Sequence, residues 1–154
     1  MRFLIQRVTQ SQVYVNKKRI SDISQGLLIF IGISQDDTDS DITYLVEKTL
    51  NLRLFPSSKT PFEYSAIETS AELLLVSQFT LYANTRKGRR PSFVNAASSE
   101  NAKELYLKTV CLFEKSGLRV ATGMFGAKML VQLKNDGPVT LLLDSLDRTI
   151  SRRS

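Results

Sequence analysis

The side chains that this sequence offers for chemistry exclude the commonest catalytic and metal sites. None of its 154 residues is a histidine, and one, Cys111, is a cysteine. Histidine is the most frequent general base and metal ligand, so neither a Ser-His-Asp triad nor a Cys-His pair can be assembled. An enzyme with this sequence must work with hydroxyls, amides, carboxylates, lysines, main-chain groups or the substrate's own atoms.

Three hydrogen-bonding side chains interrupt an apolar run in AELLLVSQFTLYA. Ser77, Gln78 and Thr80, with Phe79 among them, follow residues 73–76 at the end of an expected core strand. A polar side chain at such a position must find a partner or reach solvent. Spacing alone leaves two interpretations open: Ser77 and Thr80 face water, or the segment contributes to a site.

The segment NDGPVT, residues 135–140, separates two further apolar runs. Proline donates no N–H and glycine weakens a strand, so the pair is expected at an edge, a bulge or, most simply, a hairpin turn. A cis X–Pro bond costs only about 0.5–1 kcal/mol, so a cis Gly137–Pro138 bond is compatible with the sequence without being implied by it. Carbonyls held rigidly by such a turn would reject a substituent of the wrong handedness.

Positive charge is concentrated in one segment. The formal net charge is +6, and TRKGRRPSF places four cations within five residues: Arg86, Lys87, Arg89 and Arg90. The C-terminal end adds three more: Arg148, Arg152 and Arg153. A charge run is most often a solvated face, yet this one is also the candidate for contact with a polyanion.

The acidic segment SQDDTDSD resembles a calcium loop only in part. Asp37, Asp39 and Asp41 have the spacing of the first ligands, but Ile42 replaces the required glycine and Lys48 the required glutamate. We interpret the segment as a loop that ends in a helix N-cap. Because zinc would have to bind one cysteine and carboxylates, we expect no metal site and no cofactor.

Neither secretion nor membrane insertion is expected. The opening MRFLIQRVTQ is too short in apolar residues for a signal peptide, and no run approaches a membrane span. A single cysteine suits a reducing compartment, so we expect a cytoplasmic protein with no membrane partner. Cys111 falls near the apolar stripe of an expected helix, where a buried small hydrophobe is expected rather than a nucleophile.

The elements that must position these residues are mostly strands. Strand-length apolar runs occupy residues 2–8, 12–15, 26–33, 52–55, 72–83, 119–122, 128–134 and 139–144, and a 3.6-residue stripe predicts helices over 40–50 and 99–115. About eight strands without regular βαβ alternation predict an α+β, mainly antiparallel, barrel-like single domain with two main helices. We expect this domain over 1–145 and a basic C-terminal tail over 146–154.

Four segments together resemble D-aminoacyl-tRNA deacylases of the type widespread in bacteria and eukaryotes. In order and spacing, the resemblance is carried by SQFTL (77–81), KGRRPSF (87–93), GMFGAKM (123–129) and NDGPVT (135–140), with the opening LIQRVTQSQVYV. It extends over residues 1 to 144. Any one segment is a weak signal, whereas four in register are specific.

The resemblance implies a cytoplasmic homodimer that hydrolyses the ester joining a D-amino acid to the terminal adenosine of tRNA. By position, the ester site is lined by Ser77 and Phe79, and the residues that act there on the reacting groups are Gln78 and Thr80. The pocket around the nucleoside is shaped by Phe125 and Met129. The aminoacyl-tRNA is the partner, with Arg86, Lys87, Arg89 and Arg90 on its phosphates.

In the resembled family, Gly137 and Pro138 correspond to a cis motif inserted into the partner subunit's pocket. There it excludes L-aminoacyl substrates and so proofreads chirality. For the reaction itself, Thr80 is a candidate nucleophile, and main-chain N–H groups near Phe79 and Thr80 are a candidate oxyanion hole. Because no histidine activates Thr80, we favour attack by water assisted by the ribose 2′-hydroxyl.

Two alternatives stay open. One is a catalytically silent tRNA-binding module, against which the intact SQFT and Gly-Pro segments argue. The other is a related deacylase with shifted preference, acting on glycyl- or L-alanyl-tRNA. The sequence also departs from the family in PSSKTPFEYSA, residues 56–66, where a GKMN-containing stretch is usual.

Overall fold

The apolar alternation at the start of the chain forms one long strand, β1 (Arg2–Val15), where two had been expected. In the computed structural model, which describes residues 1–150, β1 pairs antiparallel with β2 (Lys18–Ile23), β3 (Gly26–Gly32) and β6 (Leu130–Asp144). Arg2 pairs with residues of β3 and β6, and Ser11 with residues of β2 and β6. Strand β6 therefore follows one edge of β1, while β2 and β3 share the other.

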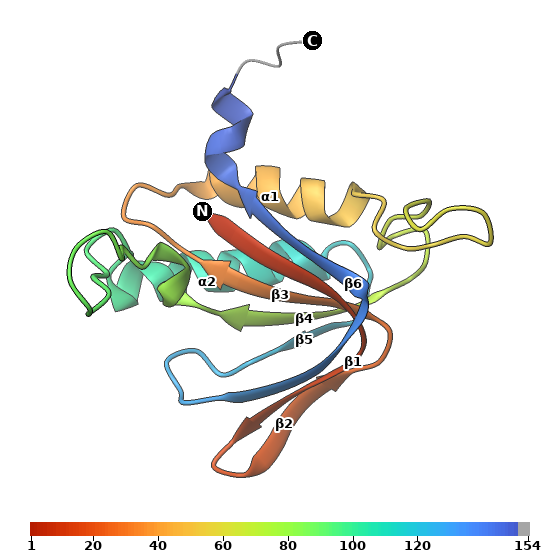
Figure 1. Ribbon diagram of the computed structural model, residues 1–154, viewed down its shortest axis with the longest axis horizontal. Helices are drawn as coiled ribbons and strands as arrows, with labels where there is room; N and C mark the ends of the chain where they lie inside the picture. Colours follow the sequence, from red (N-terminus) through yellow and green to blue (C-terminus); the bar gives the residue numbers. More distant parts are fainter. Residues whose placement is uncertain (151–154) are drawn as a thin grey trace.

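The rest of the sheet is parallel. Strand β4 (Glu72–Ser77) lies between β3 and β5 (Val120–Thr122) and is parallel to both, giving a six-stranded sheet rather than the expected eight or so strands. Helices lie in the two parallel crossovers, α1 (Asp39–Asn51) and α2 (Ser99–Glu114), as such connections require. The predicted α+β, mainly antiparallel and barrel-like fold with two main helices is confirmed (Figure 1).

Both helices begin where the sequence indicated. Thr38 caps α1 in a capping box, in which the carboxylate of Asp41 accepts from the Thr38 N–H at 2.8 Å. Ser98 caps α2 and accepts from the Asn101 N–H at 3.4 Å. The acidic segment before α1 is therefore a cap, as expected, and its carboxylates also suit the positive end of the helix dipole.

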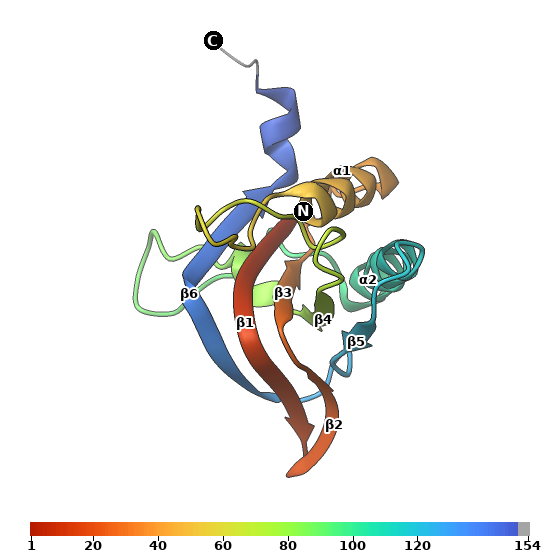
Figure 2. The ribbon, with the colours of Figure 1, turned by 90° about the vertical axis from the view of Figure 1, so that its right-hand side faces the viewer.

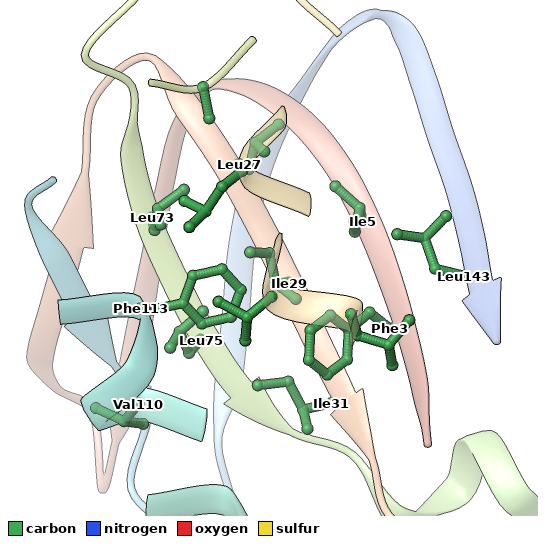
Figure 3. Close-up of a cluster of buried hydrophobic side chains, with 14 of the residues drawn as sticks. Phe3, Ile5, Leu27, Ile29, Ile31, Leu73, Leu75, Val110, Phe113 and Leu143 are labelled. Carbon is green, nitrogen blue, oxygen red and sulfur yellow. The ribbon is translucent and has the colours of Figure 1, made fainter. Parts of the chain in front are cut away.

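The main core lies between the sheet and the helices, which cover the same face of it (Figure 2). Leu27, Ile29 and Ile31 of β3 point into this core, where Phe3 and Phe113 approach with ring centroids 6.1 Å apart (Figure 3). The intervening Leu28 belongs to a second cluster, which includes six buried residues: Val8, Val13, Ile23, Leu28, Leu74 and Val76. Strands β3 and β4 are thus buried on both faces, which accounts for their nearly continuous apolar sequences.

The Gly-Pro segment is not a hairpin turn, and its peptide bond is not cis. Strand β6 runs through residues 135–140, and the Gly137–Pro138 bond is trans, as are all described peptide bonds. The β1–β6 register shifts near Val8, opposite this segment, and Gly137 has φ +116°. Four residues of β6, 136–139, lie opposite the single Arg7 of β1. A large bulge on an edge strand accommodates the extra residues and the missing proline N–H, so the strand bends without ending.

Other expectations also need correction. Cys111 is exposed, because it follows the buried Val110 and is rotated about 100° away from the buried stripe of α2. Residues 52–55 form only an isolated bridge, between Phe55 and Tyr64. The apolar run 72–83 forms β4 and then a 3₁₀ turn, η1 (Phe79–Tyr82), because its polar residues end the strand.

The first residues of the expected basic tail are ordered into a second 3₁₀ turn, η2 (Ser145–Thr149). Arg148 of this turn lies with its Nη2 3.3 Å from Oδ1 of Asp41, at the start of α1. Arg152 and Arg153 lie outside the described residues. Among residues 1–150, no helix is long and apolar enough to cross a membrane.

Candidate active site

The SQFT segment lies at the carboxyl end of β4, where the chain turns sharply. After Ser77, the Gln78 N–H donates to the carbonyl of Ile31 at 2.8 Å, which ties the start of η1 to β3. Gly32 makes this close approach feasible, because a Cβ there would lie 2.8 Å from Cβ of Leu81. The glycine at the end of β3 thus allows η1 to lie across the strand ends.

A cavity of about 580 Å³ opens at this end of the sheet. Its lining comes from three stretches, namely the end of β4 with η1, the segment that leads into α2, and the β5–β6 connection. Figure 1 shows the loop after β4 and the β5–β6 connection on the same side of the molecule, beyond the arrowhead of β4. Its size is that of a small-molecule site.

Five of the predicted site residues line this cavity together: Ser77, Gln78, Phe79, Phe125 and Met129. Phe79 is 57% exposed, and its ring meets that of Phe93 edge to face, with centroids 5.0 Å apart. Phe93 was not singled out from the sequence, although it ends the KGRRPSF segment. The aromatic rings of the cavity offer stacking surfaces for a planar group.

The wall behind Phe125 is held by α2. Tyr106 is buried, its hydroxyl donates to the carbonyl of Leu75 at 2.9 Å, and its ring lies 5.7 Å from that of Phe125. Burial raises the pKa of Tyr106 to about 12, so its hydroxyl stays protonated and keeps this hydrogen bond at neutral pH. On the same wall, the Met124 N–H donates to Sδ of Met129 at 3.3 Å.

Thr80 lies beside the cavity and is held by Gln78, whose side-chain amide donates to its hydroxyl. Within the described residues, the lining includes no carboxylate, lysine or arginine. The N–H groups of Phe79 and Thr80 open the first turn of η1, where a helix supplies no acceptors of its own. The site therefore offers neutral hydrogen-bonding groups and no charged side-chain base.

Gly137 and Pro138 do not line this cavity in the same chain. Figure 1 shows the bend in the middle of β6 on the right, whereas the loop after β4 lies on the left. Arg7, 4% exposed, supports the bend: its guanidinium donates to the carbonyl of Leu54, and its Nε lies 3.0 Å from Oδ2 of Asp136 as an ion pair. A Cβ on Gly137 would lie 2.6 Å from Nη2 of Arg7.

The four predicted RNA-binding cations are all exposed on the loop that follows η1: Arg86, Lys87, Arg89 and Arg90. Asn84 and Ser92 close the base of this loop with two backbone hydrogen bonds, of 2.7 and 2.9 Å. Phe93 follows directly and lines the cavity, so the basic loop ends at the cavity rim. Among residues 1–150, no group of three or more Cys, Asp or Glu side chains is placed to hold a metal ion.

Comparison with known proteins places these features in one family. The sequence model described as D-Tyr-tRNA(Tyr) deacylase matches residues 4–144. A D-aminoacyl-tRNA deacylase of Aquifex aeolicus (strain VF5) is 51% identical over 145 residues, 94% of this chain and 98% of its own. One of Trichodesmium erythraeum (strain IMS101) is 52% identical over 147 residues, 94% of this chain and 96% of its own.

Solved structures agree on the fold. A protein named c-Myc DNA Unwinding Element Binding Protein superposes with a TM-score of 0.88 at 37% identity, covering 94% of this chain and 98% of that one. A probable eukaryotic D-amino acid tRNA deacylase superposes with a TM-score of 0.82 at 20% identity, covering 92% and 97%.

Proposed function

The chain belongs to the D-Tyr-tRNA(Tyr) deacylase family, and from this premise we propose that it hydrolyses the ester between a D-amino acid and the terminal adenosine of tRNA. The observation that carries the proposal is the meeting of SQFT, Phe125 and Met129 in one uncharged cavity, in a chain that matches deacylases almost end to end. Free D-amino acid and reusable tRNA are the products.

The aromatic part of the cavity suits the adenine base. Phe79, Phe93 and Phe125 present ring surfaces on the cavity lining, and stacking of a base on an aromatic ring contributes about 1–3 kcal/mol. Ser77 and Gln78 lie at the end of β4, next to the place where the ribose and the ester of a stacked adenosine would lie. Base stacking thus places the scissile bond next to the first turn of η1.

The reaction is an attack by water on the ester carbonyl carbon. The C–O bond to the ribose 3′-oxygen breaks, the 3′-oxygen receives a proton, and the amino acid leaves with a free carboxyl group. The N–H groups of Phe79 and Thr80 stabilise the negative oxygen of the tetrahedral intermediate. Because no charged base among residues 1–150 lines the cavity, the ribose 2′-hydroxyl assists the water, while Gln78 and Thr80 position the groups.

Selectivity for D-amino acids comes from the main chain at Gly137 and Pro138. These residues lie on the bend of β6, away from the cavity of their own chain, so the filter acts in the cavity of a second copy within a homodimer. Backbone atoms supported by the buried Arg7 cannot move aside for an L-substituent. The site would then be complete only in the dimer.

The exposed cations of the basic loop supply the contact with tRNA phosphates. Phosphate contacts carry no sequence information, which suits an enzyme that acts on many tRNAs in the cytoplasm. The aminoacyl-tRNA, a second copy of the chain and no cofactor are the partners of this proposal.

A nucleic-acid-binding module without activity is the second candidate. It is favoured by the name of the structural relative at 37% identity, which refers to binding of a DNA element. A shift in preference toward glycyl-tRNA would leave the proposed chemistry unchanged. Residues 56–66, which differ from the family, are where such a shift could arise, because the carbonyl of Pro61 accepts from Arg7 at 3.4 Å and Arg7 supports the bend at Gly137.

These candidates are separated by measuring ester hydrolysis and binding on the same preparation. We expect release of D-tyrosine from D-tyrosyl-tRNA well above the spontaneous rate, with glycyl-tRNA as a parallel substrate. Binding of uncharged tRNA or DNA with no hydrolysis of either ester would identify the binding module and overturn the proposal.

A further inference from the structure

We propose that a second cavity beside the active site holds a nucleotide of the substrate strand that precedes the terminal adenosine. This inference rests on the proposed function and extends its substrate contacts inward from the end of the RNA. The cavity measures about 610 Å³, and its lining includes six polar residues that matter here: Arg2, Tyr82, Asn84, Arg86, Asn95 and Arg148.

The linings of the two cavities include neighbouring residues of the same two segments. Phe79 at the start of η1 lines the active site, whereas Tyr82 at its end lines the second cavity. In the segment before α2, Ala96 faces the active site and Asn95 the second cavity. The two cavities therefore adjoin along η1 and the segment before α2, so a strand whose last base is stacked on Phe79 has the second cavity next along its path.

The second cavity differs from the first in its chemistry. Side-chain amides of Gln35, Asn84 and Asn95 line it, together with the guanidinium of Arg86. Amides donate and accept, as base edges and ribose hydroxyls require, and a guanidinium pairs with phosphate. Arg86 also begins the basic loop, so the cavity adjoins the phosphate-binding surface already proposed.

The acidic residues of the lining do not leave the cavity strongly negative. Asp37 accepts from the Ser34 N–H at 2.6 Å, and Asp41 is engaged by Thr38 and Arg148. Asp36 is exposed and forms no ion pair within residues 1–150, as is also true of Arg86. The free charges of Asp36 and Arg86 offset each other in the sum, so the cavity as a whole suits the neutral base and ribose of a nucleotide, with Arg86 placed for its phosphate.

One side of the cavity is stiff. The guanidinium of Arg2 lies 4.7 Å from the ring centroid of Tyr82, and it also bonds to Asp144 at 2.9 Å and to the carbonyl of Leu81 at 2.9 Å. Burial, followed by the nearby Asp37 charge, raises the pKa of Tyr82, so the phenol stays neutral at physiological pH. A preorganised surface of this kind loses little entropy when a ligand binds.

The test compares three D-tyrosyl esters of increasing length: adenosine, CpA and CpCpA. For the unaltered protein we expect kcat/KM to rise about tenfold or more from the adenosine ester to the longer esters, as one charged or two neutral hydrogen bonds would provide.

Asn95→Asp places a negative charge in the cavity at constant size, and Asn95→Lys places a positive charge there. We expect the first to lower the CpCpA-to-adenosine ratio of kcat/KM and the second to raise it.

Asn51→Asp, an exposed change of the same charge at the end of α1, is the matched control and should leave this ratio unchanged. Equal kcat/KM for all three esters, or Asn95 variants that change all three alike, would overturn the inference while the proposed function stands. Hydrolysis of none of the esters, nor of D-tyrosyl-tRNA, would overturn both.

Discussion

At the scale of single residues, the candidate active site is distinguished by a lining that, among the described residues, includes no charged side chain. Thr80 is held by Gln78 at the edge of a cavity whose described lining is neutral, so the threonine hydroxyl has no neighbouring base to take its proton. A nucleophile without an adjacent base is weak at neutral pH. The hydroxyl is better suited to positioning than to attack.

Thr80→Val tests this assignment at nearly constant side-chain size. We expect kcat for D-tyrosyl-tRNA to fall about tenfold, as for one lost neutral hydrogen bond, with tRNA affinity unchanged. A substrate whose terminal nucleoside is 2′-deoxyadenosine should lower kcat of the unaltered protein more, about a hundredfold, because it lacks the assisting 2′-hydroxyl itself. Complete loss of turnover in Thr80→Val with binding intact would return a chemical role to the hydroxyl.

At the scale of elements, the bend of β6 shows what the sequence could and could not reveal. Stripes at 3.6-residue spacing placed both helices correctly, because each packs one apolar face on the sheet. The sequence pattern predicted two short strands in place of β1 and two in place of β6. The reason is that polar residues at a bulge have the same local pattern as those at a turn. The support of the bend by Arg7 depends on residues 54 and 61, which only the folded chain brings near residue 7.

Gly137→Ala should destabilise the protein through this bend. Gly137 has φ +116°, and an added Cβ would lie 2.6 Å from Arg7, so we expect unfolding to become easier by about 1–3 kcal/mol in urea denaturation. Gly117→Ala is the control, because Gly117 also has positive φ, +79°, but has no neighbour within 4 Å of an added Cβ. Equal losses in the two variants would show that the Arg7 contact does not constrain the bend.

The cap of α1 should make stability depend on acid pH. Burial alone would raise the pKa of Asp41, but hydrogen bonds from Ser145 and Thr38 and the charge of Arg148 lower it below the ordinary 3.8. A lowered folded-state pKa stabilises the fold above pH 3.8, and this stabilisation is lost as pH falls through the folded value. Asp41→Asn should remove this part of the pH dependence, at a cost of about 1 kcal/mol at neutral pH.

Urea denaturation from pH 7 down to the acid limit of folding would measure this effect. Asp39→Asn is the control, since Asp39 lies in the same helical turn but is exposed. A slope of unfolding free energy against pH that is the same in Asp41→Asn and the unaltered protein would contradict the account.

At the scale of the whole molecule, charge and assembly matter more than local geometry. The sequence indicated the basic loop through KGRRPSF and the site through SQFT. It did not indicate that the two lie next to each other, because the β4–η1 turn of the folded chain brings them together. Phe93 was overlooked because a single phenylalanine in a loop has no periodicity to mark it. The second copy that the Gly-Pro bend would serve cannot be read from any local pattern.

Arg89→Ala with Arg90→Ala should weaken tRNA binding in a salt-dependent way. Each lost phosphate contact lowers the slope of log affinity against log salt by about 0.7–0.9, so the double change should flatten it by about 1.5. Lys115→Ala with Arg119→Ala removes the same charge beyond the far end of α2 and should leave the slope unchanged. An unaltered slope in the first pair would make the basic loop an ordinary solvated surface.

The central claim is that a neutral cavity hydrolyses D-aminoacyl esters while the Gly-Pro main chain rejects L-aminoacyl esters. The most direct test measures deacylation rates of matched D-tyrosyl- and L-tyrosyl-tRNA by the unaltered protein and by Pro138→Ala. We expect the unaltered protein to hydrolyse the D-ester alone and Pro138→Ala to lose part of this discrimination. Equal hydrolysis of both esters by the unaltered protein, or an unchanged ratio in Pro138→Ala, would contradict the account.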